Sequence, residues 1–573
     1  MICGQFCVYF YSERKISKFS AKSYQINGEG PYYILCNSLE NGFLDGKGTP
    51  QTFTFKLEND TNFVAPSEYT VLCDGFYQRR TGQPPAFRPD YGHLYHVIAP
   101  GGVGKTFALF DETECWPSFI CDEKKQKSPL ENDWDDSYLK AKDFVNNLSL
   151  KERISLLFGT KNYVPFWDEF VDEEEQFTCV GMLDPFESEY VDFNGMCLQD
   201  GPAGVRFSNG HSISWQAAIN TAATFNKNLM YKVGKAQGEE NKEKGVNTFL
   251  SPCVNMLRTP QAGRVWEGFG EDPYLAGVAA EQIVRGIQEN GVIATIKHFV
   301  GNDQETYRQA SSSNIGMQAL MDIYVEPFYR SIKYAKCGSV MGAYNAFNNT
   351  YCCENKFLLT DVLRGILGFK GFVMSDWWAI MSDDPASLNA GCEVNMPGGA
   401  TYGIEYMGRD KSFWSKLEEY IEEGKVTADR ITEAATRIIA TMYQMNQMDD
   451  FPKVDLFTET KTKERIAIQR QAATESQILL TNDGILPLRN TEDLNITKIA
   501  IIGNDAFPRD CINGDKDMEC KNKTNLVVNG HIPLGYGSGT TKFDYLITPL
   551  EGITKLAESK NIEVVSSGKL IYE

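Results

Sequence analysis

The stretch GFKGFVMSDWWAI, residues 368–380, places a carboxylate at the end of an apolar run. Asp376 follows Phe372-Val373-Met374-Ser375 and precedes two tryptophans. An ionised aspartate in such a place can act as a nucleophile. It can also be a capped structural aspartate, and the choice depends on what else lies nearby.

Other polar residues also stand where apolar runs stop. The carboxyl ends of the strands of a (β/α) barrel share one rim, and that rim holds the active site. We therefore expect these residues to meet around Asp376, although they are far apart in the chain. They are Asp200 after GMCLQ, the two cationic residues Lys297 and His298 after VIATI, and Tyr344 after SVMGA.

The elements that must position them alternate between residues 140 and 445. Strand-like runs such as GVIATIKHF and CGSVMGAYN follow helical segments such as LAGVAAEQIVRGIQENG. The segment MQALMDIYVEPFYRSIKYAKCG predicts a helix with a kink at Pro327. This alternation indicates parallel strands with helical crossovers. The fold class expected is α/β, a (β/α)8-like (TIM) barrel followed by a partial α/β sandwich.

Four segments follow from the composition. We expect residues 1–135 to form a β-rich N-terminal extension of unknown function and residues 140–446 to form the barrel. Residues 447–472 are expected to be a linker, and residues 473–573 are expected to begin the sandwich. In the first segment, APGGVGKTF (99–107) invites a nucleotide-binding hypothesis. The Walker pattern fails there, because Ala99 stands where a glycine is required. A glycine-rich turn between strands is the favoured interpretation.

Charge and hydropathy exclude several classes of partner. The net charge is −20 and the sequence pI is about 4.9, which argues against nucleic acid. We see no run of apolar residues long enough for a transmembrane helix and expect no membrane partner. The 15 cysteines form no paired zinc motifs, and no second histidine stands at ligand spacing from His298, so neither a metal nor another cofactor is expected. The start of the chain is a poor signal peptide.

Several motifs, in order, resemble glycoside hydrolase family 3, especially its β-glucosidase branch. The resemblance spans residues 145 to 560 and includes a second-domain portion, ATESQILLTNDGILPL and YGSGTTKFDYLITPLEGI. In the barrel portion the motifs are DGPAGVR, GRVWEGFGEDP, KHFVGNDQE, MGAYNAFN, SDWW and AGCEVNMPGG.

The resemblance implies a retaining, exo-acting β-glucosidase that hydrolyses terminal β-D-glucosyl residues of cello-oligosaccharides or aryl glucosides. Asp376 matches the nucleophile, whose pKa we expect nearby donors and cations to hold low. Ligands of the first-subsite sugar are implied at Asp200, Arg206, Arg264, Lys297, His298 and Tyr344. Tyr344 can donate to the nucleophile or pack as a buried aromatic. Trp377 can stack on the sugar or form a hydrophobic wall, and Met341 can line the pocket or pack in the core.

Two further acids, Glu267 and Glu305, are interpreted as salt-bridge formers rather than as the proton donor. In enzymes of this type the general acid lies in the second domain, and we expect it beyond the end of this chain. The chain would then be a truncated product. The alternatives are a β-xylosidase of the same family and a catalytically impaired sugar-binding fragment. The expected ligand is a β-linked glucoside, and the family resemblance implies secretion; the sequence gives no oligomeric state.

Overall fold

The structure is a computed structural model. It describes residues 134–159, 179–208, 210–382, 384–398, 416–488, 496–507, 538–539, 541 and 545–567, and the backbone of four strands nearer the N-terminus. Those strands form an antiparallel sheet in chain order: β1 (Phe53–Lys56), β2 (Glu68–Cys73), β3 (Tyr95–Ile98) and β4 (Gly104–Phe107).

Strand β4 bears on the nucleotide-binding hypothesis. It contains Lys105 and Thr106 and pairs with β3, so the glycine-rich run ends in a strand. A phosphate-binding loop of the Walker type must open a helix. The hypothesis is therefore wrong; residues 99–103 lie outside the described residues.

A six-stranded sheet forms the centre of the molecule. Its neighbours are parallel except β5, which runs antiparallel to β6. In order across the sheet the strands are β13 (Phe372–Ser375), β10 (Ser339–Gly342), β8 (Ile293–Phe299), β7 (Thr248–Phe249), β6 (Met196–Gln199) and β5 (Gly181–Leu183).

The sheet curls so that its two ends approach each other. Isolated bridges add Val394 beside Met374 and Asn395 beside Phe158, beyond β13. At the β13 end of the sheet, the Trp377 indole N–H donates to the carbonyl of Val180 at 3.1 Å. Val180 precedes β5, so this bond links the two ends of the sheet. This agrees with a barrel-like α/β fold. The described residues show six strands with one reversed, however, and not the eight parallel strands of a (β/α)8 barrel.

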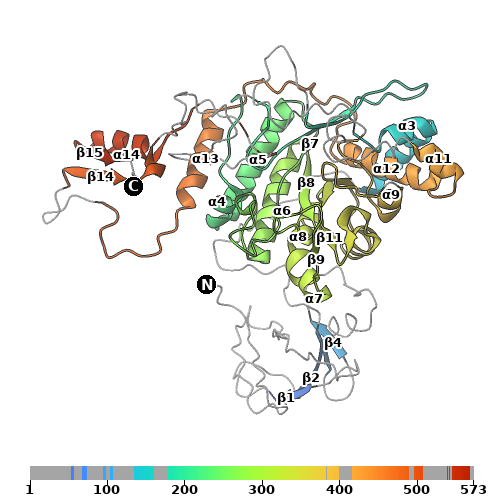
Figure 1. The fold of residues 1–573 in the computed structure, drawn as a ribbon, viewed down its shortest axis with the longest axis horizontal. Coiled ribbons are helices and arrows are strands. Elements are labelled where there is room, and N and C mark those ends of the chain that lie inside the picture. Colours follow the sequence, from blue (N-terminus) through green and yellow to red (C-terminus); the bar gives the residue numbers. More distant parts are fainter. Residues whose placement is uncertain are drawn as a thin grey trace.

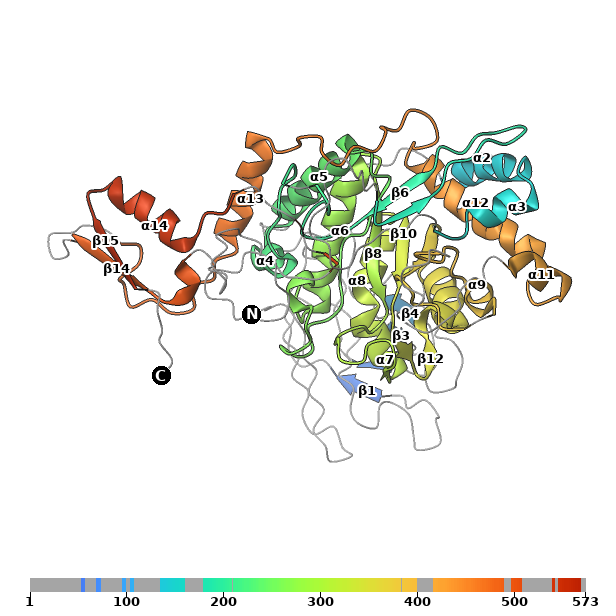
Figure 2. The same cartoon turned by 45° about the horizontal axis from the view of Figure 1, so that its top comes forward.

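Helices pack against the outside of this sheet (Figures 1 and 2). Strand β8 is buried along its whole length, as expected for a parallel strand covered on both faces. Helix α6 begins where Asp272 accepts hydrogen bonds from two backbone N–H groups and Pro273 fills the first turn. The helices are α2 (Trp134–Asn146), α3 (Leu150–Ser155), α4 (Ala218–Ala223), α5 (Lys227–Glu243), α6 (Pro273–Glu289), α8 (Glu326–Lys333), η4 (Phe357–Ile366), α9 (Ala386–Ala390), α11 (Leu417–Glu422) and α12 (Ala428–Gln444).

The helix expected to kink at Pro327 breaks earlier. It consists of α7 (Met317–Ala319), a π-helical turn η2 (Leu320–Tyr324) and then α8. Pro327 lies in the first turn of α8, where backbone N–H groups have no partner within the helix, so a residue without an N–H is tolerated. Short elements nearby are β9 (Ser312–Ser313), β11 (Ala346–Phe347), β12 (Thr350–Tyr351), η1 (Val265–Glu267) and η3 (Cys352–Glu354).

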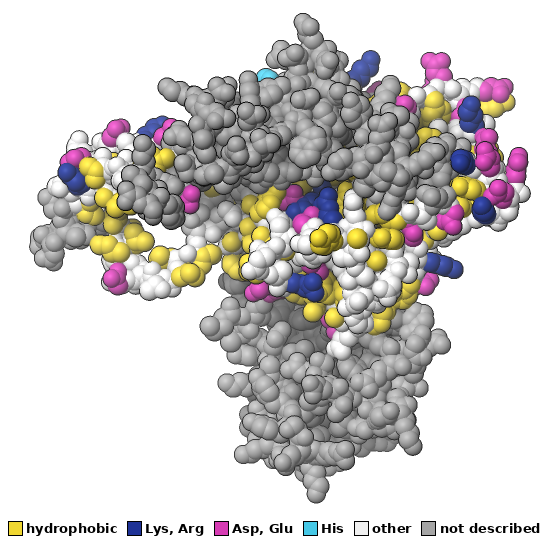
Figure 3. All heavy atoms as spheres, in the orientation of Figure 1, with side chains coloured by type: hydrophobic (Ala, Val, Ile, Leu, Met, Phe, Trp, Pro, Cys, Tyr) yellow, Lys and Arg dark blue, Asp and Glu magenta, His cyan; other side chains and the backbone are white. Residues whose placement is uncertain are grey.

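The C-terminal part carries a second, smaller α/β unit that lies to one side of the barrel (Figure 2). Strands β14 (Lys498–Ile502) and β15 (Glu563–Ser567) are parallel, and η6 (Asn504–Ala506) and α14 (Pro549–Glu558) accompany them. Helix α13 (Lys463–Glu475), which precedes this unit, packs against α4 and α5. Its apolar side chains are largely exposed, for example Leu480 and Ile502, and hydrophobic surface gathers there in Figure 3.

A disulfide between Cys179 and Cys197 links the segment before β5 to β6. Nothing in the sequence marks this pairing. The polar loop between Cys511 and Cys520, of the kind that a local disulfide closes, lies outside the described residues. Within the described ranges, no helix is both long and apolar enough to cross a bilayer.

Candidate active site

Asp376 lies immediately after β13, and backbone groups fix its carboxylate. Its own N–H donates to the Gly342 carbonyl at the end of β10, at 3.1 Å. Its Oδ1 accepts the backbone N–H of Trp377 at 2.7 Å. The residue is 8% exposed, so the carboxylate lies at the rim of the sheet with little contact to solvent.

Asp200 and Lys297 form a buried ion pair at the same rim. Lys297 Nζ lies 2.8 Å from Asp200 Oδ1. Asp200 follows β6 and opens a tight loop in which Gly201 and Gly204 exchange backbone hydrogen bonds of 2.9 Å. Gly204 has a φ of +131°, and a Cβ there would come within 2.5 Å of the Ile213 carbonyl, so the loop requires glycine.

Arg264 pairs with Glu267 instead of Asp200. Its Nε donates to Glu267 Oε2 at 2.6 Å, and its Nη1 lies 3.3 Å from His298 Nε2. Burial is the largest single effect on the pKa of Arg264 and lowers it, but Glu267, together with the smaller effects of Cys253, Glu305 and Asp376, raises the pKa overall. Glu267 is thus a salt-bridge partner that holds a guanidinium toward the site.

His298 is neutral in this setting. Its Nε2 lies 3.4 Å from Asp376 Oδ2. Burial, together with the charges of Arg264 and Lys297, lowers its pKa well below the usual 6.5. The expectation of two cationic residues after VIATI is therefore wrong for His298, because an imidazolium would be buried among other cations.

The pKa of Asp376 also departs from expectation. Burial raises it above the usual value, whereas Arg308, Arg264 and Lys297 lower it, as does the Trp377 N–H. We expected these cations to keep the pKa low. They oppose the shift, but desolvation is the larger effect.

Tyr344 and Arg308 complete the surroundings of the carboxylate. Burial raises the pKa of the Tyr344 hydroxyl well above its usual value, and the charge of Asp376 adds to this shift, so the hydroxyl stays protonated and can donate. Arg308 lies 4.3 Å from the centre of the Tyr344 ring and 2.7 Å from Glu305. Sequence reasoning missed Arg308; its spacing of three residues from Glu305 was the available signal.

The side chains of the remaining predicted residues make other contacts. Trp377 is 9% exposed and anchored through its indole N–H. Met341 is buried in β10 and belongs to the hydrophobic core, which favours packing over pocket lining. Arg206 lies 4.6 Å over the Phe207 ring; burial lowers its pKa and Asp200 opposes this.

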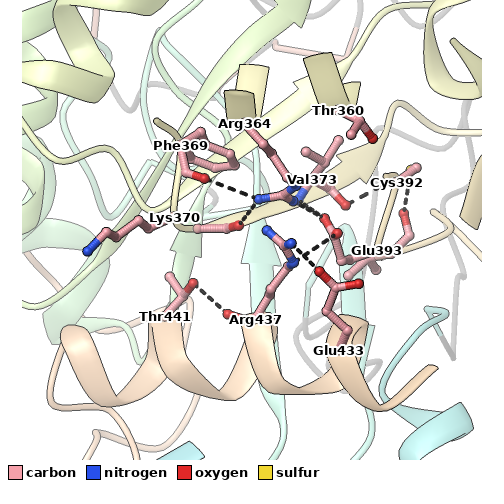
Figure 4. A network of polar contacts seen from close by, with 12 residues as sticks. Thr360, Arg364, Phe369, Lys370, Val373, Cys392, Glu393, Glu433, Arg437 and Thr441 are labelled. Carbon is pink, nitrogen blue, oxygen red and sulfur yellow. Dashed lines mark hydrogen bonds and ion pairs between the residues drawn. The ribbon is translucent and has the colours of Figure 1, made fainter. Parts of the chain in front are cut away.

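A second charge network lies behind the strand that carries Asp376 (Figure 4). Glu393 is fully buried and accepts from Arg364 at 2.6 Å and from Arg430 at 2.9 Å. Arg437 lies 3.6 Å away, and the Val373 N–H of β13 donates to Glu393 at 2.8 Å. This network joins α12 to β13 and to the bridged segment at Val394.

The described residues contain no group of three or more His, Cys, Asp or Glu side chains placed to hold a metal ion. The site combines the buried carboxylates of Asp376, Asp200 and Glu267 with several fixed cations, a neutral imidazole and a phenol. Such a set can bind hydroxyl groups in both hydrogen-bond directions and place an oxygen nucleophile among them.

Comparison with known proteins gives a consistent result. Residues 200–441 match the model of the glycosyl hydrolase family 3 N terminal domain. The chain is 36% identical over 447 residues to the protein named "Probable beta-glucosidase L" of Neosartorya fischeri, covering 76% of this chain and 56% of that protein.

Solved structures give the same picture. A beta-D-glucoside glucohydrolase of Trichoderma reesei matches with a TM-score of 0.66 and 31% identity, over 78% of this chain and 58% of that one. Beta-glucosidase 3B of Thermotoga neapolitana, in complex with glucose, matches with a TM-score of 0.61 and 30% identity, over 74% and 55%. The chain thus spans about half the length of these relatives.

Proposed function

The chain belongs to glycosyl hydrolase family 3, and from this premise we propose that it is a retaining β-glucosidase acting on terminal β-glucosyl groups. The observation that carries the proposal is the convergence on Asp376 of residues from separate strand ends. Lys297 and His298 come from β8, and Asp200 follows β6. Arg264 joins them from the loop before η1.

In the proposed reaction, an oxygen of ionised Asp376 attacks the anomeric carbon. The bond from that carbon to the leaving oxygen breaks, and the leaving group departs with the electron pair. Water then attacks the same carbon, breaks the glycosyl ester and restores the carboxylate. The Trp377 N–H and the Tyr344 hydroxyl orient Asp376, and Arg264 and Lys297 favour its charged form.

The sugar is proposed to bind where the fixed charges lie. Asp200 accepts from sugar hydroxyls, and Lys297 and Arg264 donate to them. Charged partners form the stronger hydrogen bonds with neutral hydroxyls. The Trp377 indole is proposed to face an apolar side of the sugar ring.

The proton donor for the leaving group is not assigned to Glu267 or Glu305. Each is paired with an arginine, Arg264 and Arg308 respectively. These ion pairs give both side chains a structural partner, which favours a supporting role for each. An activated aryl leaving group needs no proton, so it tests the Asp376 step by itself.

The test uses 2,4-dinitrophenyl 2-deoxy-2-fluoro-β-glucoside with the full chain. We expect a stoichiometric release of dinitrophenolate and a fluoroglucosyl adduct on the peptide that contains Asp376, found by mass spectrometry. Asp376→Asn should give neither, whereas Glu305→Gln should still give the adduct. A folded wild-type sample without an adduct on Asp376 contradicts the proposal.

We further propose that the protein is exported from the cell. The Cys179–Cys197 disulfide supports this, because such bonds persist in oxidising compartments.

A further inference from the structure

The Asn255 side chain lies between β7 and η1 and holds both backbone polar groups of His298. Its Nδ2 donates to the His298 carbonyl at 2.9 Å, and its Oδ1 accepts the His298 N–H at 3.0 Å. An amide nitrogen only donates and an amide oxygen only accepts, so one orientation of the amide satisfies both partners. The amide oxygen is therefore the atom that faces the imidazole.

This orientation decides which imidazole nitrogen carries the proton. Nδ1 of His298 lies 2.9 Å from Asn255 Oδ1, so Nδ1 must donate. On the other side of the ring, Nη1 of Arg264 lies 3.3 Å from Nε2. A guanidinium only donates, so Nε2 must accept. Both contacts select the neutral ring with its proton on Nδ1.

We propose that Asn255 is a positioning residue that holds His298 as the Nδ1–H tautomer and thereby keeps Nε2 an acceptor, which receives Arg264 and directs no proton at Asp376. Nε2 lies 3.4 Å from Asp376 Oδ2 and in this tautomer gives that oxygen no proton. A substrate hydroxyl that reaches Nε2 can only donate to it, and it must then share or displace the Arg264 contact. The role in catalysis rests on the proposed glucosidase function, whereas the tautomer does not.

The opposite tautomer would change the site in two ways. Nε2–H would donate to Asp376 Oδ2 and occupy a lone pair of the attacking carboxylate. It would also face the Arg264 N–H, so that two donors point at each other. The other group near Nδ1 is Cys253, whose Sγ is 3.9 Å away; burial raises the pKa of that thiol to about 11. A neutral thiol cannot replace the amide oxygen as a strong acceptor.

The direct test is nitrogen NMR of the full chain labelled with 15N-histidine. The chain has five histidines, and His298→Gln identifies the His298 signals by their loss. In the wild type we expect a protonated Nδ1 and a bare Nε2, unchanged between about pH 5 and pH 8 because burial and neighbouring cations lower the His298 pKa. Asn255→Leu removes the acceptor and should move the proton to Nε2.

Asn255→Asp keeps a hydrogen-bond acceptor at the same place. It provides a second test of the proposal if the Asn255→Leu variant does not fold. Its anion should keep Nδ1 protonated and raise the His298 pKa, so that an imidazolium signal grows as the pH falls. Asn241→Leu is the matched control. Asn241 is fully buried in α5, and among the described contacts its side chain bonds only to Gln237 of its own helix. It should destabilise the fold and leave the His298 spectrum unchanged.

A kinetic measurement then tests the role in catalysis. With dinitrophenyl β-glucoside, Asn255→Leu should lower kcat by roughly ten- to a hundred-fold, the scale of losses from a misplaced reacting group. A wild-type ring protonated on Nε2, or an Nδ1–H signal that survives in Asn255→Leu, overturns the tautomer assignment. An unchanged kcat in a tautomer-shifted variant overturns the positioning role. A wild type with the expected spectrum and no turnover overturns the glucosidase proposal and leaves the tautomer assignment standing.

Discussion

Replacement of Glu393 by glutamine is expected to destabilise the barrel strongly although no substrate-binding group changes. Glu393 is the only carboxylate that contacts Arg364 in the described ion pairs, and it also pairs with Arg430 and Arg437. These three guanidinium side chains are 11–17% exposed. Glutamine keeps the size of the side chain and removes its charge.

The expected loss of stability follows from the ion pairs that the three arginines lose. Removal of one partner from a buried ion pair costs about 3–5 kcal/mol, because the remaining charge stays desolvated. At roughly 2–4 °C per kcal/mol for a barrel-sized domain, the midpoint of thermal unfolding should fall by roughly 6–20 °C.

The assay is thermal unfolding of the full chain, followed by circular dichroism at one fixed scan rate. Glu433→Gln is the matched control, since Glu433 contacts Arg430 and Arg437 in the same cluster but its side chain is 50% exposed. That variant should cost at most about 1 kcal/mol. Equal shifts for the two variants, or a shift of less than about 2 °C for Glu393→Gln, would refute the reasoning.

Other perturbations give further expectations. Burial raises the pKa of Glu240 to about 7, so the folded state holds its proton and stability falls as the pH rises from 4.5 toward 7. Glu240→Gln should make the free energy of unfolding less dependent on pH in this range, by up to about 3 kcal/mol, as measured by urea unfolding. Curves of stability against pH that run parallel for the variant and the wild type would contradict this. Arg308→Met removes the strongest cation lowering the pKa of Asp376, so the acid limb of kcat/KM should move to higher pH. An unmoved limb would count against this role of Arg308. Asp376→Asn should abolish adduct formation yet raise the unfolding midpoint at pH 7, because a desolvated carboxylate is replaced by a neutral amide; a lower midpoint would contradict this.

The sequence allowed the rim residues to be predicted because parallel strands place their carboxyl ends together. Asp200, Lys297, His298 and Asp376 each follow or end an apolar run, and the structure brings them together as expected. The family motifs added Arg264, which follows no such run. The barrel itself was predictable from alternation, but the reversed direction of β5 was not, because three residues carry no signal of strand direction.

Properties that depend on tertiary burial could not be predicted in the same way. The neutral state of His298 and the raised pKa of Asp376 follow from desolvation by segments distant in sequence. Asn255 acts on a residue 43 positions away, and nothing in SPCVNMLRT marks it. Glu393 did leave a signal, an acid inside the apolar run GCEVNM, which favours a buried ion pair.

The anchoring of Trp377 has a practical consequence. Its indole is fastened to the Val180 carbonyl, and Val180 directly follows Cys179, which is bonded to Cys197. The side chain that follows Asp376 is therefore held by a segment whose position depends on a covalent bond. Preparations purified with and without a reductant are therefore expected to differ at Trp377, and their affinities for the glucosides proposed as substrates should be compared only after the thiols have been counted.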